Sequence, residues 1–202
     1  MADTKRYLLF AGINGAGKST LYRSDLWHAE QERGGLPRVN SDEIAAAHGW
    51  DWNDRAAQIA AGKEALALIK HYFENGISFN QETTLTGRLI LRNIARAKAE
   101  GYHITMYYVG LENPHIANER IERRIDHGGH GIDAETVIRR AKASIENLIS
   151  TVPLCDEVFL FDNTYLLKLV ARIMKGDLVS YESGLEGITW PHDVMRRLIA
   201  QC

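Results

Sequence analysis

Eight residues near the N-terminus have the types and spacing needed to bind phosphate. Residues 12–19, with the letters GINGAGKS, follow the pattern G-x-x-x-x-G-K-[ST] directly after the apolar run 7–11. Glycines let the backbone bend so that successive N–H groups point at phosphate oxygens, and the helix that follows adds the positive end of its dipole. In such a loop Lys18 reaches the β- and γ-phosphates, and the Ser19 hydroxyl binds Mg²⁺. The sequence therefore predicts a nucleotide-binding site.

Asp42 is the first acidic residue placed to act beside this loop. It follows a short predicted strand that ends near Val39 and stands near the start of a predicted helix, 43–48. In a phosphoryl-transfer enzyme, a carboxylate at this point accepts or orients the proton of the substrate hydroxyl. Ser and Asp are also favoured at helix N-caps, so Ser41 or Asp42 could serve as a cap instead. Both roles are compatible if Ser41 is the cap, and we interpret Asp42 as catalytic and substrate-binding.

Glu82 and Thr84 form a second polar group at a predicted strand end. They follow the predicted strand 77–80 and precede the predicted helix 87–100. Ligands of open α/β sheets bind at the carboxyl ends of the strands, so both side chains are predicted to contact a substrate. The alternative is that Thr84 or Thr86 caps the helix that begins at Gly87.

Arginines gather in the segment 113–148, which is predicted to form two helices joined by the glycine-rich residues 127–133. Arg120, Arg123 and Arg124 are spaced to share one face of the first helix. A mobile helical pair that carries arginines over a phosphate loop would expel water and supply positive charge to the transferred group. The alternative is a solvated basic face balanced by neighbouring glutamates.

The second helix of this predicted lid carries two adjacent arginines. Its apolar stripe leaves Arg139 near solvent and Arg140 closer to the border of the stripe, which favours Arg140 as the inward cation. We therefore predict that Lys18, Asp42, Arg124 and Arg140 are the catalytic residues. The residues expected to contact the nucleotide are Gly12, Asn14, Gly15, Ala16, Gly17, Lys18, Ser19 and Thr20 in the loop, with Arg120 and Asn163 further along the chain.

Asp162, Asn163 and Thr164 follow the last predicted core strand, 157–161. Asp162 resembles the acid that ends a strand in many nucleotide-binding proteins, but its place after the last core strand argues against that role. The loop at this position more often borders the nucleotide base, so Asn163 and Thr164 are candidates for base contacts. A simple turn is the alternative.

Apolar runs alternate with amphipathic stretches along the whole chain, which predicts a three-layer α/β/α fold with a mainly parallel five-stranded core sheet. Residues 1–202 are expected to form one domain, with the lid at about 113–148 and a hairpin near the C-terminus. The predicted strands are 6–11, one ending near 39, 77–80, 103–109 and 157–161, the hairpin strands are 166–174 and 178–181, and the predicted helices are 18–28, 43–48, 54–73, 87–100, the lid pair and 191–200.

Composition excludes several classes of protein. The 202 residues are 45% hydrophobic, enough for a large core, and the net charge of −2 predicts no broad surface for nucleic acid or an anionic membrane. The two cysteines have no metal or redox spacing, and the first apolar run is too short for a signal peptide or a membrane span. The sequence is most simply interpreted as that of a cytoplasmic protein.

The chain resembles the zeta-toxin family of small P-loop kinases, and more closely a compact bacterial branch of it. The resemblance depends on the phosphate loop, Asp42, the pair Glu82-x-Thr84, and the segment 124–148 with its Gly-Gly-His and paired arginines. It implies that ATP with Mg²⁺ phosphorylates a hydroxyl of a UDP-activated amino sugar such as UDP-N-acetylglucosamine. It also implies Asp42 as the base, Glu82 and Thr84 as substrate contacts, Arg124 and Arg140 as phosphate clamps, and an antitoxin protein as a partner.

Two other functions stay open at this point. The same chemistry could serve another metabolite as acceptor. The chain could also be a P-loop ATPase that works as a nucleotide-dependent switch with a protein partner, although it lacks the guanine motif Asn-Lys-x-Asp and the ABC signature Leu-Ser-Gly-Gly-Gln. Acids at the strand ends, suited to a second substrate, favour the kinase.

Overall fold

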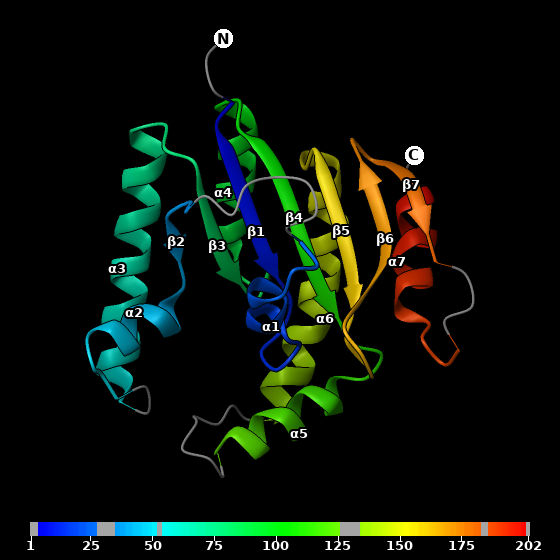
Figure 1. Ribbon diagram of the computed structural model, residues 1–202, viewed down its shortest axis with the longest axis horizontal. Coiled ribbons are helices and arrows are strands. Elements are labelled where there is room, and N and C mark those ends of the chain that lie inside the picture. Colours follow the sequence, from blue (N-terminus) through cyan, green and yellow to red (C-terminus); the bar gives the residue numbers. More distant parts are fainter. Residues whose placement is uncertain (1–3, 28–34, 52–53, 126–133, 183–185, 201–202) are drawn as a thin grey trace.

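The computed structural model describes residues 4–27, 35–51, 54–125, 134–182 and 186–200, and within these ranges seven strands form one sheet (Figure 1). Their order is β2-β3-β1-β4-β5-β6-β7. The first five in this order run parallel, and β6 and β7 extend the sheet as an antiparallel hairpin, which confirms the predicted core and hairpin. The strands are β1 (Arg6–Ala11), β2 (Arg38–Val39), β3 (Phe79–Thr83), β4 (His103–Gly110), β5 (Glu157–Asp162), β6 (Lys168–Met174) and β7 (Asp177–Tyr181).

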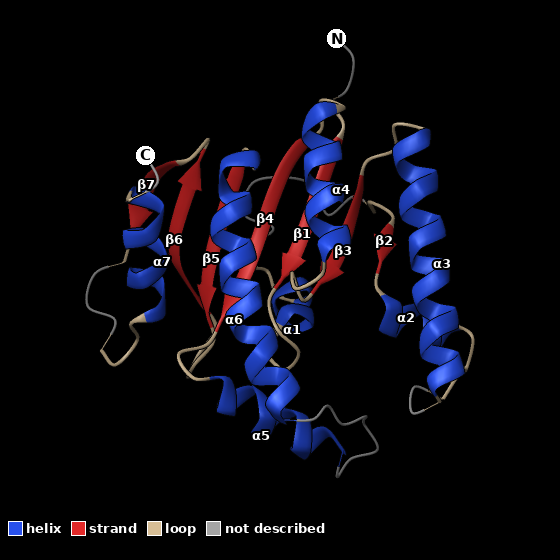
Figure 2. Cartoon of the chain, turned by 180° about the vertical axis from the view of Figure 1, so that it is seen from behind, coloured by secondary structure: helices blue, strands red, loops and turns tan. Residues whose placement is uncertain are grey.

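Helices pack on both faces of this sheet. Figure 2 shows α3, α4, α6 and α7 in front of one face, with α1 behind the strands. Among the described residues, no helix is both long and apolar enough to cross a membrane. The helices are α1 (Lys18–Arg23), α2 (Ser41–Ala47), α3 (Arg55–Glu74), α4 (Arg88–Ala99), α5 (Pro114–Ile125), α6 (Ala134–Thr151) and α7 (Trp190–Ile199), and a 3₁₀ turn, η1 (Val152–Leu154), follows α6.

The central strand β1 divides its side chains between two hydrophobic clusters, because successive side chains of a strand point to opposite faces. Tyr7 and Leu9 are fully buried in the larger cluster, which also takes in α3, α4, α6 and α7. Phe10 is fully buried in the smaller cluster with Leu21 of α1 and Ile121 of α5. The phosphate loop thus leaves a strand that is fixed from both sides.

Several predicted boundaries are wrong, and local hydrogen bonds explain one of them. The helix expected over 18–28 ends at Arg23, because the Ser24 backbone N–H and hydroxyl both donate to the Leu21 carbonyl, at 3.0 and 2.7 Å, and close the last turn. The strand expected at 77–80 is β3, which runs to Thr83 in register with Ala11. Its last residues are polar and carry no hydrophobic signal, so the pattern alone placed the end of the strand three residues early.

The C-terminal helix α7 is held to the strand ends by Glu112. The Glu112 carboxylate accepts hydrogen bonds from the Thr189 hydroxyl and N–H, both at 2.6 Å, and from the Trp190 N–H at 3.0 Å. Burial raises the pKa of Glu112, but these hydrogen bonds outweigh it and the pKa lies below its ordinary value. The Trp190 indole N–H donates to Asp162 at 2.8 Å. Together these contacts attach α7 to the ends of β4 and β5.

We expect Glu112→Gln to lower the free energy of unfolding by about 1 kcal/mol at neutral pH, since it replaces a charged helix cap by a neutral one. Because the folded-state pKa is lowered, this stabilisation is complete above the ordinary pKa of glutamate and is lost as the pH falls through the folded-state value. Urea unfolding at neutral pH and at roughly pH 3 measures both effects. Glu119→Gln is the control, because its carboxylate lies 3.9 Å from Arg123 on the surface. An equal difference from wild type at both pH values would contradict the linkage.

Candidate active site

The phosphate loop connects β1 to α1 and is packed too closely for side chains at its glycines. Gly12, Gly15 and Gly17 all have positive φ, at 135°, 77° and 107°. A Cβ at Gly15 would lie 2.6 Å from the carbonyl oxygen of Ala117, and Cβ atoms at Gly12 and Gly17 would overlap the Val109 carbonyl and the Asn163 amide. The glycines therefore allow both the bend of the loop and its contact with β4, α5 and the loop after β5.

Lys18 and Ser19 begin α1 and turn toward the end of β3. The Lys18 ammonium donates to the Ile13 carbonyl at 3.1 Å and lies 3.7 Å from the Glu82 carboxylate. The Ser19 hydroxyl donates to the same carboxylate, with oxygen–oxygen distances of 3.2 and 3.3 Å. Two residues predicted to meet a triphosphate and its metal thus face a side chain that was predicted to meet the substrate.

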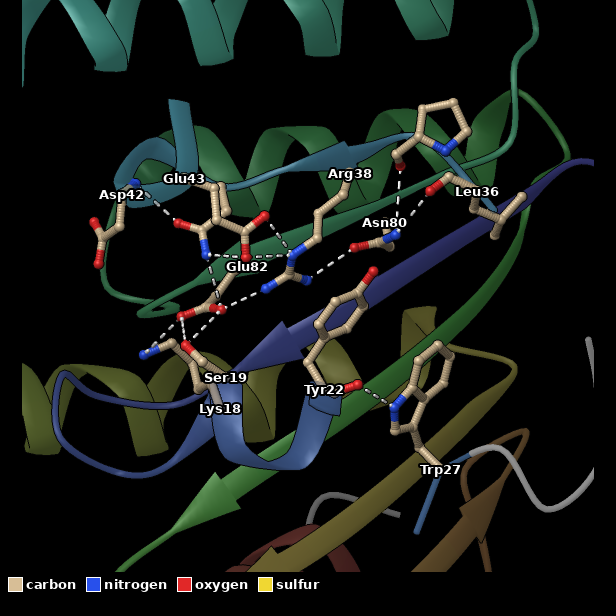
Figure 3. Close-up of polar contacts among 12 residues, drawn as sticks. Lys18, Ser19, Tyr22, Trp27, Leu36, Arg38, Asp42, Glu43, Asn80 and Glu82 are labelled. Carbon is tan, nitrogen blue, oxygen red and sulfur yellow. Dashed lines mark hydrogen bonds and ion pairs between the residues drawn. The ribbon is translucent and has the colours of Figure 1, made fainter. Parts of the chain in front are cut away.

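Arg38 joins this group from β2, as Figure 3 shows. Its guanidinium donates to Glu82 at 2.7 Å, to Glu43 at 2.9 Å and to the Asn80 side-chain oxygen at 3.0 Å. Its face lies 3.5 Å from the centre of the Tyr22 ring. The side chains of Arg38 and Glu82 are only 9% and 11% exposed, so this is a nearly buried ion pair. Sequence analysis did not identify Arg38, and an arginine in a two-residue strand gave no signal that would have done so.

Asp42 lies in the first turn of α2, and its carboxylate is not the helix cap. Asn40 is the N-cap, because its side-chain oxygen accepts from the Asp42 N–H at 2.9 Å. The alternative in which Ser41 or Asp42 caps this helix is therefore wrong, and the helix begins two residues earlier than predicted. Asp42 itself is exposed at the carboxyl end of β2, near Glu82 and the phosphate loop in Figure 3.

Thr84 lies just beyond β3, where its hydroxyl is 2.8 Å from that of Thr86. Gly87 is the N-cap of α4, and no side chain makes a capping hydrogen bond there. The alternative that Thr84 or Thr86 caps this helix is therefore also wrong. The loop is fixed by Leu85, whose carbonyl accepts from Asn147 of α6 at 2.8 Å. Thr84 and Thr86 therefore follow Glu82 in the chain and do not cap α4.

The predicted lid arginines lie in different surroundings. Arg140 of α6 donates to the side-chain oxygen of Asn14 in the phosphate loop at 2.9 Å, whereas Arg139 is exposed. Arg120 of α5 donates to the carbonyls of Asn163 and Thr164 at 2.8 and 3.3 Å. The side chain of Arg124, in the last turn of α5, lies outside the described part of the chain, as do the glycine-rich residues 126–133.

The loop after β5 supports the phosphate loop from the side opposite β3. The Asn163 side-chain amide donates to the Ala16 carbonyl at 2.7 Å. Asp162 is fully buried and accepts from the Thr164 N–H and hydroxyl, at 2.9 and 2.8 Å, as well as from Trp190. Asp162 therefore orders a turn and attaches α7, and Thr164 has its hydroxyl directed at Asp162. Of the side chains predicted near the base, that of Asn163 contacts the loop itself.

The donor set around Ser19 fits Mg²⁺. Mg²⁺ prefers oxygen ligands, usually keeps several waters, and is commonly bound through one or two protein oxygens together with substrate phosphates. The Ser19 hydroxyl and the Glu82 carboxylate supply such oxygens side by side. No group of three or more metal-binding side chains occurs among the described residues, so a metal here would depend on the nucleotide for much of its shell.

Comparison with known sequences gives one family and one curated relative. A family model described as Zeta toxin matches residues 2–165. An uncharacterized protein of Haemophilus influenzae is 35% identical over 132 residues, which cover 65% of this chain and 89% of that protein. The residues matched by the family model therefore include the phosphate loop, β3 and both helices of the predicted lid.

Comparison with solved structures shows a shared fold. A chain of the PezAT chromosomal toxin-antitoxin system of Streptococcus pneumoniae is similar with a TM-score of 0.60 and 15% identity, over 98% of this chain and 87% of that one. A chain of the AvrRxo1-ORF1:-ORF2 structure with ATP has a TM-score of 0.69 and 16% identity, over 93% of this chain and 64% of that one. At these low sequence identities, the comparison shows a shared fold.

The packing of the loop predicts different effects for two glycine substitutions. Gly15→Ala places a side chain at positive φ against the Ala117 backbone, so we expect it to destabilise the protein by about 1–3 kcal/mol and to weaken nucleotide binding. Gly62→Ala, within α3, meets no atom within 4 Å and should stabilise by about 0.5–1 kcal/mol. Denaturant unfolding and titration with ATP test both variants. A Gly15→Ala protein that keeps wild-type stability and affinity would exclude the close packing described.

Proposed function

The chain belongs to the Zeta toxin family, and on this premise we propose that it is an ATP-dependent kinase. It transfers the γ-phosphate to a hydroxyl of a UDP-activated amino sugar such as UDP-N-acetylglucosamine. The observation that carries the proposal is that a complete phosphate loop faces acidic and hydroxyl side chains at the ends of β2 and β3. A nucleotide switch needs the loop alone, whereas a kinase also needs a second set of groups for an acceptor.

The phosphate loop supports the ATP half of this proposal. Loop N–H groups and the Lys18 ammonium would hold the phosphates of ATP, and the Ser19 hydroxyl would hold its magnesium ion. When bound, Mg²⁺ neutralises charge on the phosphate oxygens. The Lys18 ammonium donates to the Ile13 carbonyl, so its side chain lies along its own loop. Positioning and charge stabilisation supply most of the catalysis in this class of reaction.

Asp42 supports the acceptor half. Asn40, and not Asp42, caps α2, and Asp42 is an exposed residue in the first turn of that helix. In the proposed reaction Asp42 accepts the proton of the acceptor hydroxyl as the oxygen attacks the γ-phosphorus, and ADP leaves in line. Glu82, in β3, and Thr84, just after that strand, are proposed to contact the acceptor.

Arginines of the lid supply positive charge for the transferred group. Arg140 donates to the side-chain oxygen of Asn14 in the phosphate loop. We propose that Arg140 and Arg124 bind the γ-phosphate and that Arg120 contacts the nucleotide. Guanidinium groups suit this role because they bind phosphate oxygens in pairs and stay charged.

An antitoxin protein is the proposed partner. This part of the proposal is supported by family membership and by the architecture shared with a chain of the PezAT toxin-antitoxin system. Kinase activity that consumes a nucleotide sugar would need to be restrained in the cell that makes it, and a partner that covers the ATP or acceptor site would do so.

The kinase reaction is tested with γ-labelled ATP and a panel of UDP-sugars. Label should pass to the acceptor with wild type, whereas Asp42→Asn should lower the rate about 10²–10⁴-fold with ATP affinity kept, because only the base is lost. Lys18→Ala should lose both ATP binding and transfer. Asp177→Asn, at the start of β7 far from the loop, is the control. Release of free phosphate alone, undiminished in Asp42→Asn, would reject the kinase and favour the nucleotide switch.

Arg140 and Arg139 form a matched pair for the clamp. We expect Arg140→Gln to lower kcat about a hundredfold or more, since it removes charge from the transferred phosphate. Arg139→Gln, one position away and exposed, should stay within about twofold of wild type. Steady-state kinetics at saturating ATP measures both rates. Equal activity of the two variants would remove Arg140 from the mechanism.

A further inference from the structure

The face of the sheet opposite α3, α4, α6 and α7 carries a cavity of about 310 Å³. Its lining residues on β1, β4 and β5 alternate with the buried residues of the larger cluster, so they point away from those helices (Figure 1). The volume lies within the range of small-molecule sites, roughly 300–1,000 Å³. The cavity begins at Arg6, His103 and Glu157, the first residues of their strands, whereas the phosphate loop follows the other end of β1. It is therefore separate from the nucleotide site.

Aromatic rings on neighbouring strands form one wall of this cavity. The ring centres of Tyr107 in β4 and Phe159 in β5 lie 5.1 Å apart, with an angle of 14° between the ring planes. Side-by-side coplanar rings would collide at that separation, so the two rings overlap face to face and direct their edges away from the sheet. The guanidinium of Arg172 continues the row on β6, 5.2 Å from the centre of Phe159. Because the edge of an aromatic ring is the positive part of its quadrupole, this wall favours negative charge or the face of another ring.

Trp27 forms another part of the wall and is held from several sides. Its indole N–H donates to the Tyr22 carbonyl at 2.8 Å, and the Tyr22 ring stacks on it with 5.5 Å between the ring centres. The Trp27 ring also lies edge to face against Phe10 and Tyr107, with centres 5.0 and 5.8 Å apart. A side chain with these contacts is positioned before any ligand binds, so the cost of ordering it on binding is small.

The charged side chains of the cavity carry an excess of positive charge. Arg6 and Arg172 line it, together with the carboxylate of Glu157. Glu157 lies 3.2 Å from Arg172 and 3.6 Å from Nε2 of His103. The side chains of Arg172 and Glu157 are 26% and 21% exposed, so both charges are largely withdrawn from water. Two arginines and one carboxylate leave one positive charge, which an anionic ligand would neutralise.

We propose that this cavity is a second ligand site, for a planar aromatic anion of the aromatic carboxylate class. The ring system of the ligand packs against Tyr107, Phe159 and Trp27, and its carboxylate neutralises the charge of Arg6 and Arg172. An aliphatic carboxylate would lose the first set of contacts, and an uncharged aromatic ring would lose the second. The site thus differs from the phosphate loop both in its place and in its ligand.

The test is calorimetric titration of the whole chain with naphthoate, a two-ring aromatic carboxylate. One molecule should bind per chain. Naphthalene methanol, an uncharged analogue, and hexanoate, an aliphatic carboxylate, should each bind about tenfold or more weakly. Saturating Mg-ATP should not displace naphthoate, because the two sites lie at opposite ends of β1.

Two substitutions within one ion pair should have opposite effects on this affinity. Arg172→Gln removes a cation and should weaken naphthoate binding about tenfold, whereas Glu157→Gln removes the competing carboxylate and should strengthen it. Arg6→Gln, at the second cation, should also weaken it and remains informative if Arg172→Gln does not fold. Phe159→Leu keeps an apolar side chain but removes the ring edge, so it should weaken binding about three- to tenfold. Thermal unfolding without ligand shows which variants are folded.

Lys98 and Asp156 provide the matched control. They form an ion pair at 3.1 Å, and Asp156 directly precedes Glu157 in the chain. Lys98 belongs to α4, which lies on the other face of the sheet (Figure 2). Lys98→Gln therefore breaks a similar ion pair away from the cavity and should leave the affinity for naphthoate unchanged.

Several outcomes would overturn this site. Naphthoate that does not bind, that binds no more tightly than its uncharged analogue, or that Mg-ATP displaces would each do so. Weaker binding in both Arg172→Gln and Glu157→Gln would do so in favour of a purely structural ion pair. A free protein that sediments as a dimer, and that naphthoate converts to a monomer, would assign the cavity to a second copy of the chain instead. The proposed kinase stands in all these cases, because the titration needs neither acceptor nor turnover.

Discussion

The register of β1 against β3 is the constraint on which the site depends. Phe10 pairs with Glu82 and Ala11 with Thr83, so the carboxylate reaches the strand end two residues before the phosphate loop begins. Because side chains alternate between the two faces, a shift by one residue would turn Glu82 away from Ser19 and Lys18. Because β2, β3 and β4 run parallel, their carboxyl ends lie at the same edge of the sheet. Asn40, Thr84 and the segment that leads to α5 follow these strand ends. The geometry of the candidate site thus follows from strand pairing before any loop is considered.

Buried charged side chains are the second feature of this edge of the sheet. Lys18, Arg38 and Glu82 are each about nine-tenths buried, and two cations meet one carboxylate there, with Glu43 at the more exposed end. Burying charges costs free energy that the pair alone seldom recovers, and apolar residues of similar size often stabilise a fold as well. A cluster of this kind is therefore better explained by a ligand that completes it than by stability. In the proposed function, Mg-ATP is the ligand that would bind beside this cluster.

Much of the fold could be predicted because its signals are local. The apolar runs of β1, β4 and β5 and the glycine pattern of the loop read the same way in the sequence and in the structure. The polar end of β3, the early end of α1 and the Asn40 cap escaped prediction, since each depends on one hydrogen bond or on a partner strand. Arg38 was not predicted for the same reason, because its contacts form only when β2 pairs with β3.

By itself, the sequence determined the phosphate loop, the parallel core, the C-terminal hairpin and the set of polar residues at the strand ends, because glycine geometry and hydrophobic periodicity are properties of short segments. Only the tertiary structure decided which of those polar residues meet. It brought Glu82 to Ser19, Arg38 to Glu82, Arg140 to Asn14 and Asn163 to Ala16, over separations of 44 to 147 residues. Such contacts depend on strand register and helix packing, which no local pattern encodes.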